Sequence, residues 1–418
     1  MDVRLPSLLL TSLGTAFLVT PIARGLGASL GLLDHPCQRK VQRTAIPRTG
    51  GIGILAGLSS GMALLATLAG SLGIPLGREV LAVCLGGLVV HAVGVLDDLW
   101  DIPAPAKLLA QSAAVGAVVS SGVVLQGLSL GGHDWSLGFF AAPLTALFIL
   151  GFINALNLVD GLDGLASGIA AVAAFAMVAT GVLEGNAMLA GLAMLLLGAT
   201  LGFMPYNFLR GKKVFLGDGG SMLLGYGIAV VAVEGSRFGG GDATPLLVVL
   251  ACASVPILDT ATTIARRVRN HQGLFRADSM HVHHRFLRFG LTPVRTVGTI
   301  LGITLVIACQ SLAGLVEGLR GLLAVSVLAA VLVAAGIRRA PHERTSPESD
   351  PSFREILFYL LGAQDGATPR LRGDMALTEI LSGTPRARSA PAATPEPAGA
   401  PARAAEPASV EAAAAVPE

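Results

Sequence analysis

Long apolar runs dominate the amino-acid sequence and limit what it can fold into. An α-helix needs about 20 mostly apolar residues to cross the hydrocarbon core of a bilayer, where every backbone polar group must be bonded within the segment. Eleven such runs predict an all-α, polytopic integral membrane helical bundle of eleven transmembrane helices. The runs lie at 5–24, 51–72, 79–96, 107–126, 136–157, 164–183, 187–206, 220–236, 244–264, 294–314 and 319–337.

The composition agrees with a chain that has the lipid bilayer as a partner. Charged residues make up 13% of the chain, whereas soluble domains carry about 25%. A net charge of +2 leaves no excess of positive charge for nucleic acid, and we expect no nucleic-acid partner. The four cysteines are scattered and fit neither a disulfide framework nor a zinc site.

Basic residues between the runs set the expected orientation. The loops of one side hold only Arg4, Arg78, Arg237 and Arg320. The positive-inside rule places the richer side in the cytoplasm, which puts the N-terminus outside. The richer side carries Arg24, Arg39, Lys40, Arg43, Arg48, Lys107, Arg210, Lys212, Lys213 and the arginines between 266 and 295.

Three regions are expected along the chain. The membrane domain covers 1–340, and a cytoplasmic segment at 341–383 includes a candidate amphipathic helix near 353–362. The tail at 384–418 is rich in Ala, Pro and Glu and has almost no large apolar residues. Such a segment cannot bury enough surface to offset its ordering entropy, so we predict disorder there.

Carboxylate and amide side chains gather at the ends of runs on the predicted cytoplasmic side. Ionisable groups at membrane depth are costly and point to function, although a carboxylate at a helix end also fits an interfacial cap. The glycines after Asp160 and Asp163 permit sharp turns and close approach by a ligand. These side chains are Asp97, Asp98, Asn154, Asn157, Asp160, Asp163 and Asp218.

Asp218 lies in the glycine-rich segment F-L-G-D-G-G-S at the start of a predicted helix. Backbone N–H groups and the helix dipole favour anions at such a place. Mg²⁺ prefers one or two protein oxygens together with substrate phosphates and water. The segment therefore predicts a site for a phosphate and its Mg²⁺, with Mn²⁺ as the alternative metal.

The segment H-V-H-H-R places His281, His283 and His284 beside Arg285. We interpret it as a polar wall that binds a phosphate or a sugar hydroxyl, with Arg285 suited to a phosphate in fork geometry. A zinc site and a pH-responsive surface loop are the alternatives. Lys107 is placed to reach a phosphate near the aspartates, and Lys40 enforces the topology, meets an anionic lipid head or nucleotide, or does both.

Several carboxylates, a hard metal and basic residues at one membrane face suit phosphoryl transfer between a soluble and a lipid substrate. The motifs together resemble the polyprenyl-phosphate N-acetylhexosamine-1-phosphate transferase family, in its bacterial undecaprenyl-phosphate N-acetylglucosamine-1-phosphate branch. The resemblance covers about 30–310. The motifs are D-H-P…R-K…P-R-T-G-G-I-G-I, G-V-L-D-D-L-W-D-I…K-L, N-A-L-N-L-V-D-G-L-D-G-L-A, F-L-G-D-G-G-S and P-I-L-D-T…A-D…H-V-H-H-R-F-L-R-F-G-L.

The resemblance implies a helical bundle with a cytoplasmic active-site cleft in the bacterial inner membrane. Members use Mg²⁺, take a sugar-1-phosphate from a uridine diphosphate sugar, load it onto a polyprenyl phosphate such as undecaprenyl phosphate and release UMP. One departure is Gln42, where the family usually has His. The muramoyl-pentapeptide transferase and an ion-coupled secondary transporter are the alternative functions, and a homodimer is one alternative for the oligomeric state.

The resemblance also implies roles for single residues. It matches Asp218 and Asn157 to metal binding, Asp97 and Asp98 to the acidic pair near the lipid phosphate, and Lys107 to a phosphate contact. Together with the reading of the motifs, this gives three groups. We predict Asp97, Asp98, Asp160 and Asp163 for catalysis, Asn157 and Asp218 for the metal, and Lys40, Lys107, Asn154, His281, His283, His284 and Arg285 for substrate or phosphate binding.

Overall fold

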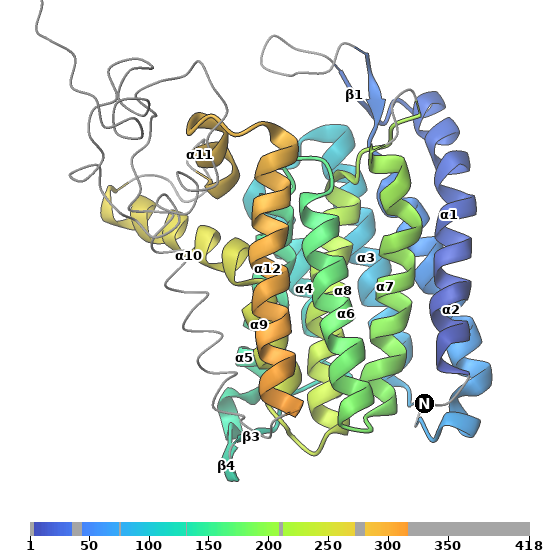
Figure 1. Cartoon of the computed structure of the whole chain (residues 1–418), viewed down its shortest axis with the longest axis vertical. Helices are drawn as coiled ribbons and strands as arrows, with labels where there is room; N and C mark the ends of the chain where they lie inside the picture. The colour runs from blue at the N-terminus through green and yellow to red at the C-terminus, as the bar shows by residue number, and fades with distance from the viewer. Residues whose placement is uncertain are drawn as a thin grey trace, which may run out of the picture. The chain divides into compact units, whose positions relative to one another are not determined.

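The computed structural model describes residues 4–35, 44–74, 77–130, 132–208, 212–271 and 281–316. All of them lie in the compact unit Met1–Gln364. They form a helical bundle with two short β-hairpins, which confirms the all-α membrane fold (Figure 1). The helices are α1 Leu5–Ser29, α2 Gly50–Leu72, α3 Glu79–Trp100, α4 Ala104–Ser120, α5 Ala141–Val159, α6 Leu165–Leu183, α7 Ala187–Phe208, α8 Gly217–Phe238, α9 Thr244–Cys252, α10 Ser254–Arg269, α11 Val282–Arg288 and α12 Pro293–Val316, with a 3₁₀ turn at Gly138–Phe140.

The expected number of eleven spans is not confirmed. Within the described residues, eight helices are long and apolar enough to cross a membrane, or nine when α9 and α10 count as one broken span. The predicted run 107–126 forms only the 17-residue helix α4, and the chain continues in non-helical backbone after it. The run 319–337 and the segments 341–383 and 384–418 lie outside the described residues.

Helix α8 is the centre of the bundle. It packs against α2, α3, α5, α6, α7 and α9, and its membrane-length window is 94% buried. A helix that is apolar on all sides faces lipid or is buried among other helices, and α8 is of the second kind. Glycines permit the closest of these contacts: a Cβ on Gly94 of α3 would lie 2.5 Å from the Cα of Gly219 in α8.

A sharp bend breaks the predicted span at 244–264 into two helices. The run forms α9 and α10, which meet at Ala253 with a bend of 73°. Pro256 lies in the first turn of α10, where a residue needs no backbone N–H for the bonds within that helix. Because Pro has no N–H, it cannot bond to a carbonyl at the end of α9, and the two helices do not continue as one. Figure 1 shows α10 running out from the side of the upright helices, with α11 above it.

Two antiparallel hairpins interrupt the helical pattern. Strands β1 Leu33–Asp34 and β2 Ile46–Pro47 pair at one end of the bundle. Strands β3 Gly127–Leu130 and β4 His133–Ser136 pair between α4 and α5, and Ser129 forms a parallel bridge with Asp242 before α9. The first hairpin brings Asp34 next to Arg48 and so contributes to the site described next.

Candidate active site

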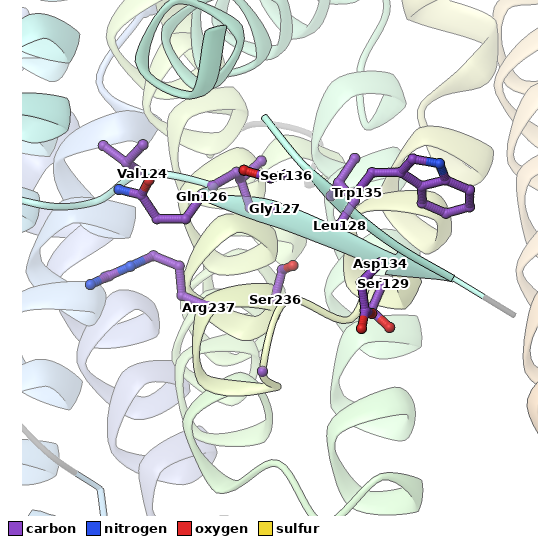
Figure 2. Close-up of a pocket in the computed structure, with 13 residues that line it drawn as sticks. Val124, Gln126, Gly127, Leu128, Ser129, Asp134, Trp135, Ser136, Ser236 and Arg237 are labelled. Carbon is purple, nitrogen blue, oxygen red and sulfur yellow. The ribbon is translucent and has the colours of Figure 1, made fainter. Parts of the chain in front are cut away.

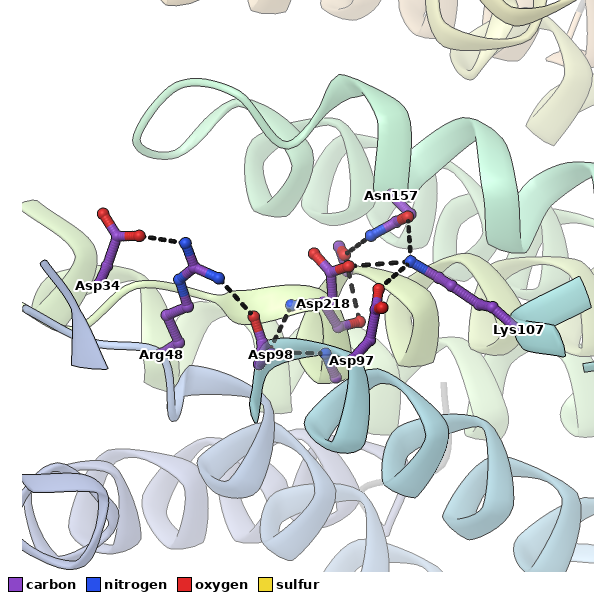
Figure 3. Close-up of polar contacts among 9 residues, drawn as sticks. Asp34, Arg48, Asp97, Asp98, Lys107, Asn157 and Asp218 are labelled. Atoms are coloured by element: carbon purple, nitrogen blue, oxygen red, sulfur yellow. Dashed lines mark hydrogen bonds and ion pairs between the residues drawn. The ribbon is translucent and has the colours of Figure 1, made fainter. Parts of the chain in front are cut away.

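Four helix ends meet at one end of the bundle and bring together side chains from distant parts of the chain (Figure 3). Asp97 and Asp98 lie in the last turn of α3, and Lys107 in the first turns of α4. Asn157 lies in the last turn of α5, and Asp218 in the first turn of α8. Asp101 takes a left-handed conformation between α3 and α4, and this tight turn returns Lys107 to Asp97.

The ammonium group of Lys107 lies at the centre of this cluster. Its Nζ is 2.5 Å from Asp97 Oδ2, 2.9 Å from Asp218 Oδ2 and 3.0 Å from Asn157 Oδ1. Three oxygens therefore converge on one position that holds a positive charge. Asn157 is fixed in this orientation because its Nδ2 donates to Ser221 Oγ at 3.0 Å.

Asp98 faces a different part of the site from its neighbour Asp97. Its Oδ2 accepts from the backbone N–H of Asp218 at 2.8 Å, and its Oδ1 accepts from Arg48 at 3.3 Å. The side chain is only 2% exposed. Asp98 thus satisfies the first N–H groups of α8 from outside the helix, and Arg48 joins it to Asp34 on β1.

The backbone at Gly217 explains why glycine precedes Asp218. Gly217 has φ of 73°, and a Cβ there would lie 2.7 Å from Asp98 Oδ2. A side chain would be strained by the conformation and would block the carboxylate. The glycine-rich segment therefore permits the close contact between α3 and α8, in addition to the close approach of a ligand.

Asp160 and Asp163 lie in the turn between α5 and α6, beside the Lys107 cluster. Asp163 is paired with Lys213, which was expected only to set the topology. Burial, and next the charges of Asp218 and Asp98, hold the pKa of Asp160 well above its ordinary value. Asn207 fixes the turn, since its Oδ1 accepts from the N–H of Gly164 at 2.5 Å.

The histidine segment packs directly on this turn. A Cβ on Gly161 would lie 2.4 Å from His283 Nε2, so glycine is required for the contact. The rings of His281 and His283 are stacked with centroids 6.0 Å apart, and those of His283 and His284 are 4.2 Å apart. Burial, and next the neighbouring rings of His284 and His281, lower the pKa of His283 to about 3.

Asn154 is a predicted residue that does not join the Lys107 cluster. Asn154 bonds to Gln111 of α4 at 2.8 Å and to the carbonyl of Leu150 at 2.9 Å, so its amide joins two helices. Lys40 lies outside the described residues. Arg285 is buried on α11 next to the histidines.

The donor set of the cluster fits a hard cation. Oxygens of Asp97, Asn157 and Asp218 already surround one positive charge at 2.5–3.0 Å, and Mg²⁺ takes oxygen ligands. Among the residues that the structure describes, no three His, Cys, Asp or Glu side chains form a metal-binding group. A metal here would draw its remaining ligands from substrate phosphates and water.

A cavity of about 480 Å³ lies at the other end of α8 (Figure 2). The hairpin β3–β4 and the last turn of α8 line it, with Leu128, Trp135 and Arg237 among the side chains. Arg237 is already paired with Glu234 at 2.6 Å. The cavity contains none of the predicted site residues.

Comparison with known proteins identifies the family. A model of glycosyl transferase family 4 matches residues 80–236, which include the Lys107 cluster. The chain is similar to a Bacillus subtilis (strain 168) protein named probable undecaprenyl-phosphate N-acetylglucosaminyl 1-phosphate transferase. The two are 33% identical over 292 residues, which are 69% of this chain and 79% of that protein. The chain belongs to the polyprenyl-phosphate N-acetylhexosamine-1-phosphate transferase family.

Other members of this transferase family are similar to the same extent. The decaprenyl-phosphate N-acetylglucosaminephosphotransferase of Mycobacterium tuberculosis (strain ATCC 25618 / H37Rv) is 34% identical over 310 residues, 68% of this chain and 76% of that protein. The undecaprenyl-phosphate alpha-N-acetylglucosaminyl 1-phosphate transferase of Escherichia coli (strain K12) is 32% identical over 295 residues, 68% of this chain and 77% of that protein. The chain is therefore a sugar-phosphate transferase and a multi-pass membrane protein.

The structure adds residues to the transferase site that the sequence analysis did not select. Lys213 was interpreted only as a topology signal, and Arg48 as a topology signal or a contact to an anionic lipid head or nucleotide, yet each pairs with a site carboxylate. Ser221 stands at the end of the F-L-G-D-G-G-S motif and holds Asn157. Asp259, in the P-I-L-D-T motif, bonds to His281. The motifs contain three of these residues and Lys213 lies just before one, but their spacing along the chain does not show which side chains meet.

Proposed function

We propose that this transferase moves N-acetylglucosamine-1-phosphate from UDP-N-acetylglucosamine to undecaprenyl phosphate, or a similar polyprenyl phosphate, and releases UMP. The observation that carries the proposal is the convergence of Asp97, Asn157 and Asp218 on one cation position at an end of the bundle. Curated relatives that are 32–34% identical have names with this reaction type.

Asp218 and Asn157 are the residues that would hold Mg²⁺, which supplies neutralising charge for the pyrophosphate when it is bound. Lys107 binds a phosphate oxygen of the donor, and Asp97 orients the ammonium through their 2.5 Å contact. Asp98 holds the start of α8, and with it the backbone of Asp218, in place. The site thus acts by positioning and charge, as phosphoryl transfer requires.

The reaction proceeds by attack of a polyprenyl phosphate oxygen on the β-phosphorus of the nucleotide sugar. A new P–O bond forms, the bond from the β-phosphorus to the bridging oxygen breaks, and UMP leaves with that oxygen. The acceptor is largely dianionic at neutral pH, since the second pKa of a phosphate monoester is near ~6. It needs little help from a general base. The almost complete burial of Asp98 supports a positioning role over an aspartyl-phosphate intermediate.

We place the site at the cytoplasmic face of the bacterial inner membrane. Lys107, Lys213 and Arg48 lie at the site end of the bundle, in agreement with the positive-inside rule. The test uses a cysteine-free variant with Cys introduced at Lys212 or at His133, which are both exposed. An impermeant maleimide added to intact cells should label position 133 and spare position 212; labelling of 212 would place the site outside.

The reaction is tested with purified protein, an isoprenyl phosphate acceptor and a panel of labelled UDP-sugars. We expect UMP release and lipid labelling with UDP-N-acetylglucosamine at a kcat/KM well above that for the other sugars.

Preference for a UDP-muramoyl-pentapeptide would favour the muramoyl branch. Solute uptake into proteoliposomes without transfer would favour a transporter. Light scattering of the protein in detergent would test the homodimer.

A further inference from the structure

Helix α10 carries one carboxylate that the reaction described above does not use. Asp259 is 3% exposed and lies on the part of the broken span that runs away from α9. Its Oδ2 lies 2.9 Å from His281 Nδ1, and its Oδ1 accepts from the backbone N–H of Val282 at 3.2 Å. Asp259 thus contacts both the first imidazole of the histidine segment and the start of α11.

The chemistry of this contact fixes the proton of His281. A carboxylate can only accept hydrogen bonds, so the Nδ1 that faces it carries hydrogen. In the neutral ring Nε2 then has the free lone pair, and in the protonated ring Nε2 is a donor. The bond also sets the plane of the ring, because the partner carboxylate is itself held by Val282. A buried carboxylate is costly unless it is bonded in this way.

The effect of this bond reaches the Asp160–Asp163 turn. The His281 ring is stacked parallel to that of His283, with an angle of 5° between their planes. His283 in turn packs against Gly161. The order of contacts is therefore Asp259, His281, His283 and the turn that lies beside the Lys107 cluster.

We propose that Asp259 is a positioning residue of this transferase, which fixes the ring orientation and Nδ1 proton of His281 so that Nε2 meets the phosphate or sugar of the donor. This inference rests on the proposed function for the role of His281. At metal sites, partners that orient a ligating histidine through its other nitrogen change metal affinity or activity by about 10- to 100-fold when they are removed, and we expect an effect of this size here.

The first test measures the proton itself and needs no substrate. Protein labelled with ¹⁵N-histidine is prepared in detergent at pH 8, and the His281 signals are assigned by their loss in His281→Gln. We expect hydrogen on Nδ1 in the wild type and on Nε2 in Asp259→Asn, because the amide N–H₂ can face Nδ1 only as a donor. Hydrogen on Nε2 of His281 in the wild type would overturn the proposal, even if Asp259→Asn fails to fold.

The matched control is Asp242→Asn. Asp242 also accepts a backbone N–H, that of Thr244 at 2.9 Å, but it precedes α9 at the other end of the bundle. This variant should leave the His281 signals and the transfer rate unchanged. A change of the His281 tautomer in Asp242→Asn would show that the measurement reports general loosening, which would also contradict the specific contact.

The second test is a double-mutant cycle on kcat/KM for the nucleotide sugar. Asp259→Asn should lower kcat/KM by about 10- to 100-fold, and it should cost little more when His281→Gln is already present. Equal costs in both backgrounds would show a merely structural role and overturn the proposal. Wild-type protein that transfers no sugar phosphate would refute the proposed function, whereas the tautomer measurement would still decide the Asp259–His281 contact.

Discussion

Lys107 Nζ lies 2.9 Å from Asp218 Oδ2, at a position that Asp97 and Asn157 oxygens also face. The ammonium therefore occupies the place where Asp218 and Asn157 would hold a metal ion. A cation that enters this cluster competes with the charge of Lys107 unless a phosphate draws the lysine away. The relationship links binding of the donor phosphate to binding of the metal.

Lys107→Gln should bind Mn²⁺ more tightly than the wild type when no substrate is present. A unit charge 4 Å away is worth about 4 kcal/mol at an effective dielectric of 20. Displacement of the lysine and solvent screening reduce this energy, and a remainder of about 1.4 kcal/mol still gives a gain of about tenfold. Mn²⁺ titration followed by electron paramagnetic resonance measures it. Lys213→Gln, which removes a lysine paired with Asp163 instead, is the control and should change little. Weaker Mn²⁺ binding in Lys107→Gln would show that the lysine supports the metal site.

Substitutions at Asp218 and Asp98 should respond differently to Mg²⁺. Asp218→Asn removes a charge that attracts a hard cation, and activity should nearly vanish. Asp218→Glu keeps that charge in a displaced position, so raising Mg²⁺ should partly restore its rate. Asp98→Asn weakens the tie to Arg48 and the start of α8, and Mg²⁺ should not restore it. Initial rates over a Mg²⁺ titration decide between these outcomes. Near-normal rates in Asp218→Asn would show that Asp218 is not a metal ligand and that other oxygens hold the ion.

Gly94→Ala should destabilise the protein and reduce transfer together. The added methyl would lie 2.5 Å from the backbone of Gly219, which cannot move aside as a side chain can. Helices α3 and α8 would have to separate, at a cost of about 1–3 kcal/mol, and Asp98 would lose its contact with α8. Gly116→Ala in α4 is the matched control, since nothing lies within 4 Å of its Cβ position. Thermal unfolding in detergent should show a lower melting temperature for Gly94→Ala and an unchanged one for Gly116→Ala.

The sequence predicted the gathering of Asp97, Lys107, Asn157 and Asp218 because all four stand at ends of apolar runs on one predicted side. The structure gives their contacts, which depend on how the helices pack and how each side chain is oriented. Asp97 and Asp98 are neighbours about 100° apart around α3, so one faces Lys107 and the other faces the start of α8. Hydropathy alone could not show this division.

Three other features could not be predicted from apolar runs, for physical reasons. The run at 244–264 has enough apolar residues for one span, but its hydropathy does not show the bend at Ala253 or the contact that α10 makes with α5. Asn154 was selected for its place near the aspartates, yet its side chain meets Gln111, because both residues lie about one turn further from the helix ends than Asn157 and Lys107. The pairing of Asp259 with His281 joins residues 22 positions apart.

His283 should make stability fall on mild acidification. Burial, then the rings of His284 and His281, hold the pKa of His283 at about 3 in the folded protein, against about 6.5 in the unfolded chain. Between these values the unfolded state binds the proton and the folded state does not. The free energy of unfolding therefore falls as pH drops below 6.5, by about 1.4 kcal/mol per pH unit.

The comparison of His283→Gln with wild type isolates this contribution. At pH 5 the loss from His283 is about 2 kcal/mol, and the variant lacks it because Gln binds no proton. Melting temperatures in detergent at pH 7.5, 6 and 5 should therefore decline less steeply for His283→Gln. His133→Gln on the exposed strand β4 is the control and should follow the wild type. Parallel declines for all three proteins would mean that His283 is protonated in the folded state, and the wall it forms with His281 would then carry positive charge towards the donor phosphates.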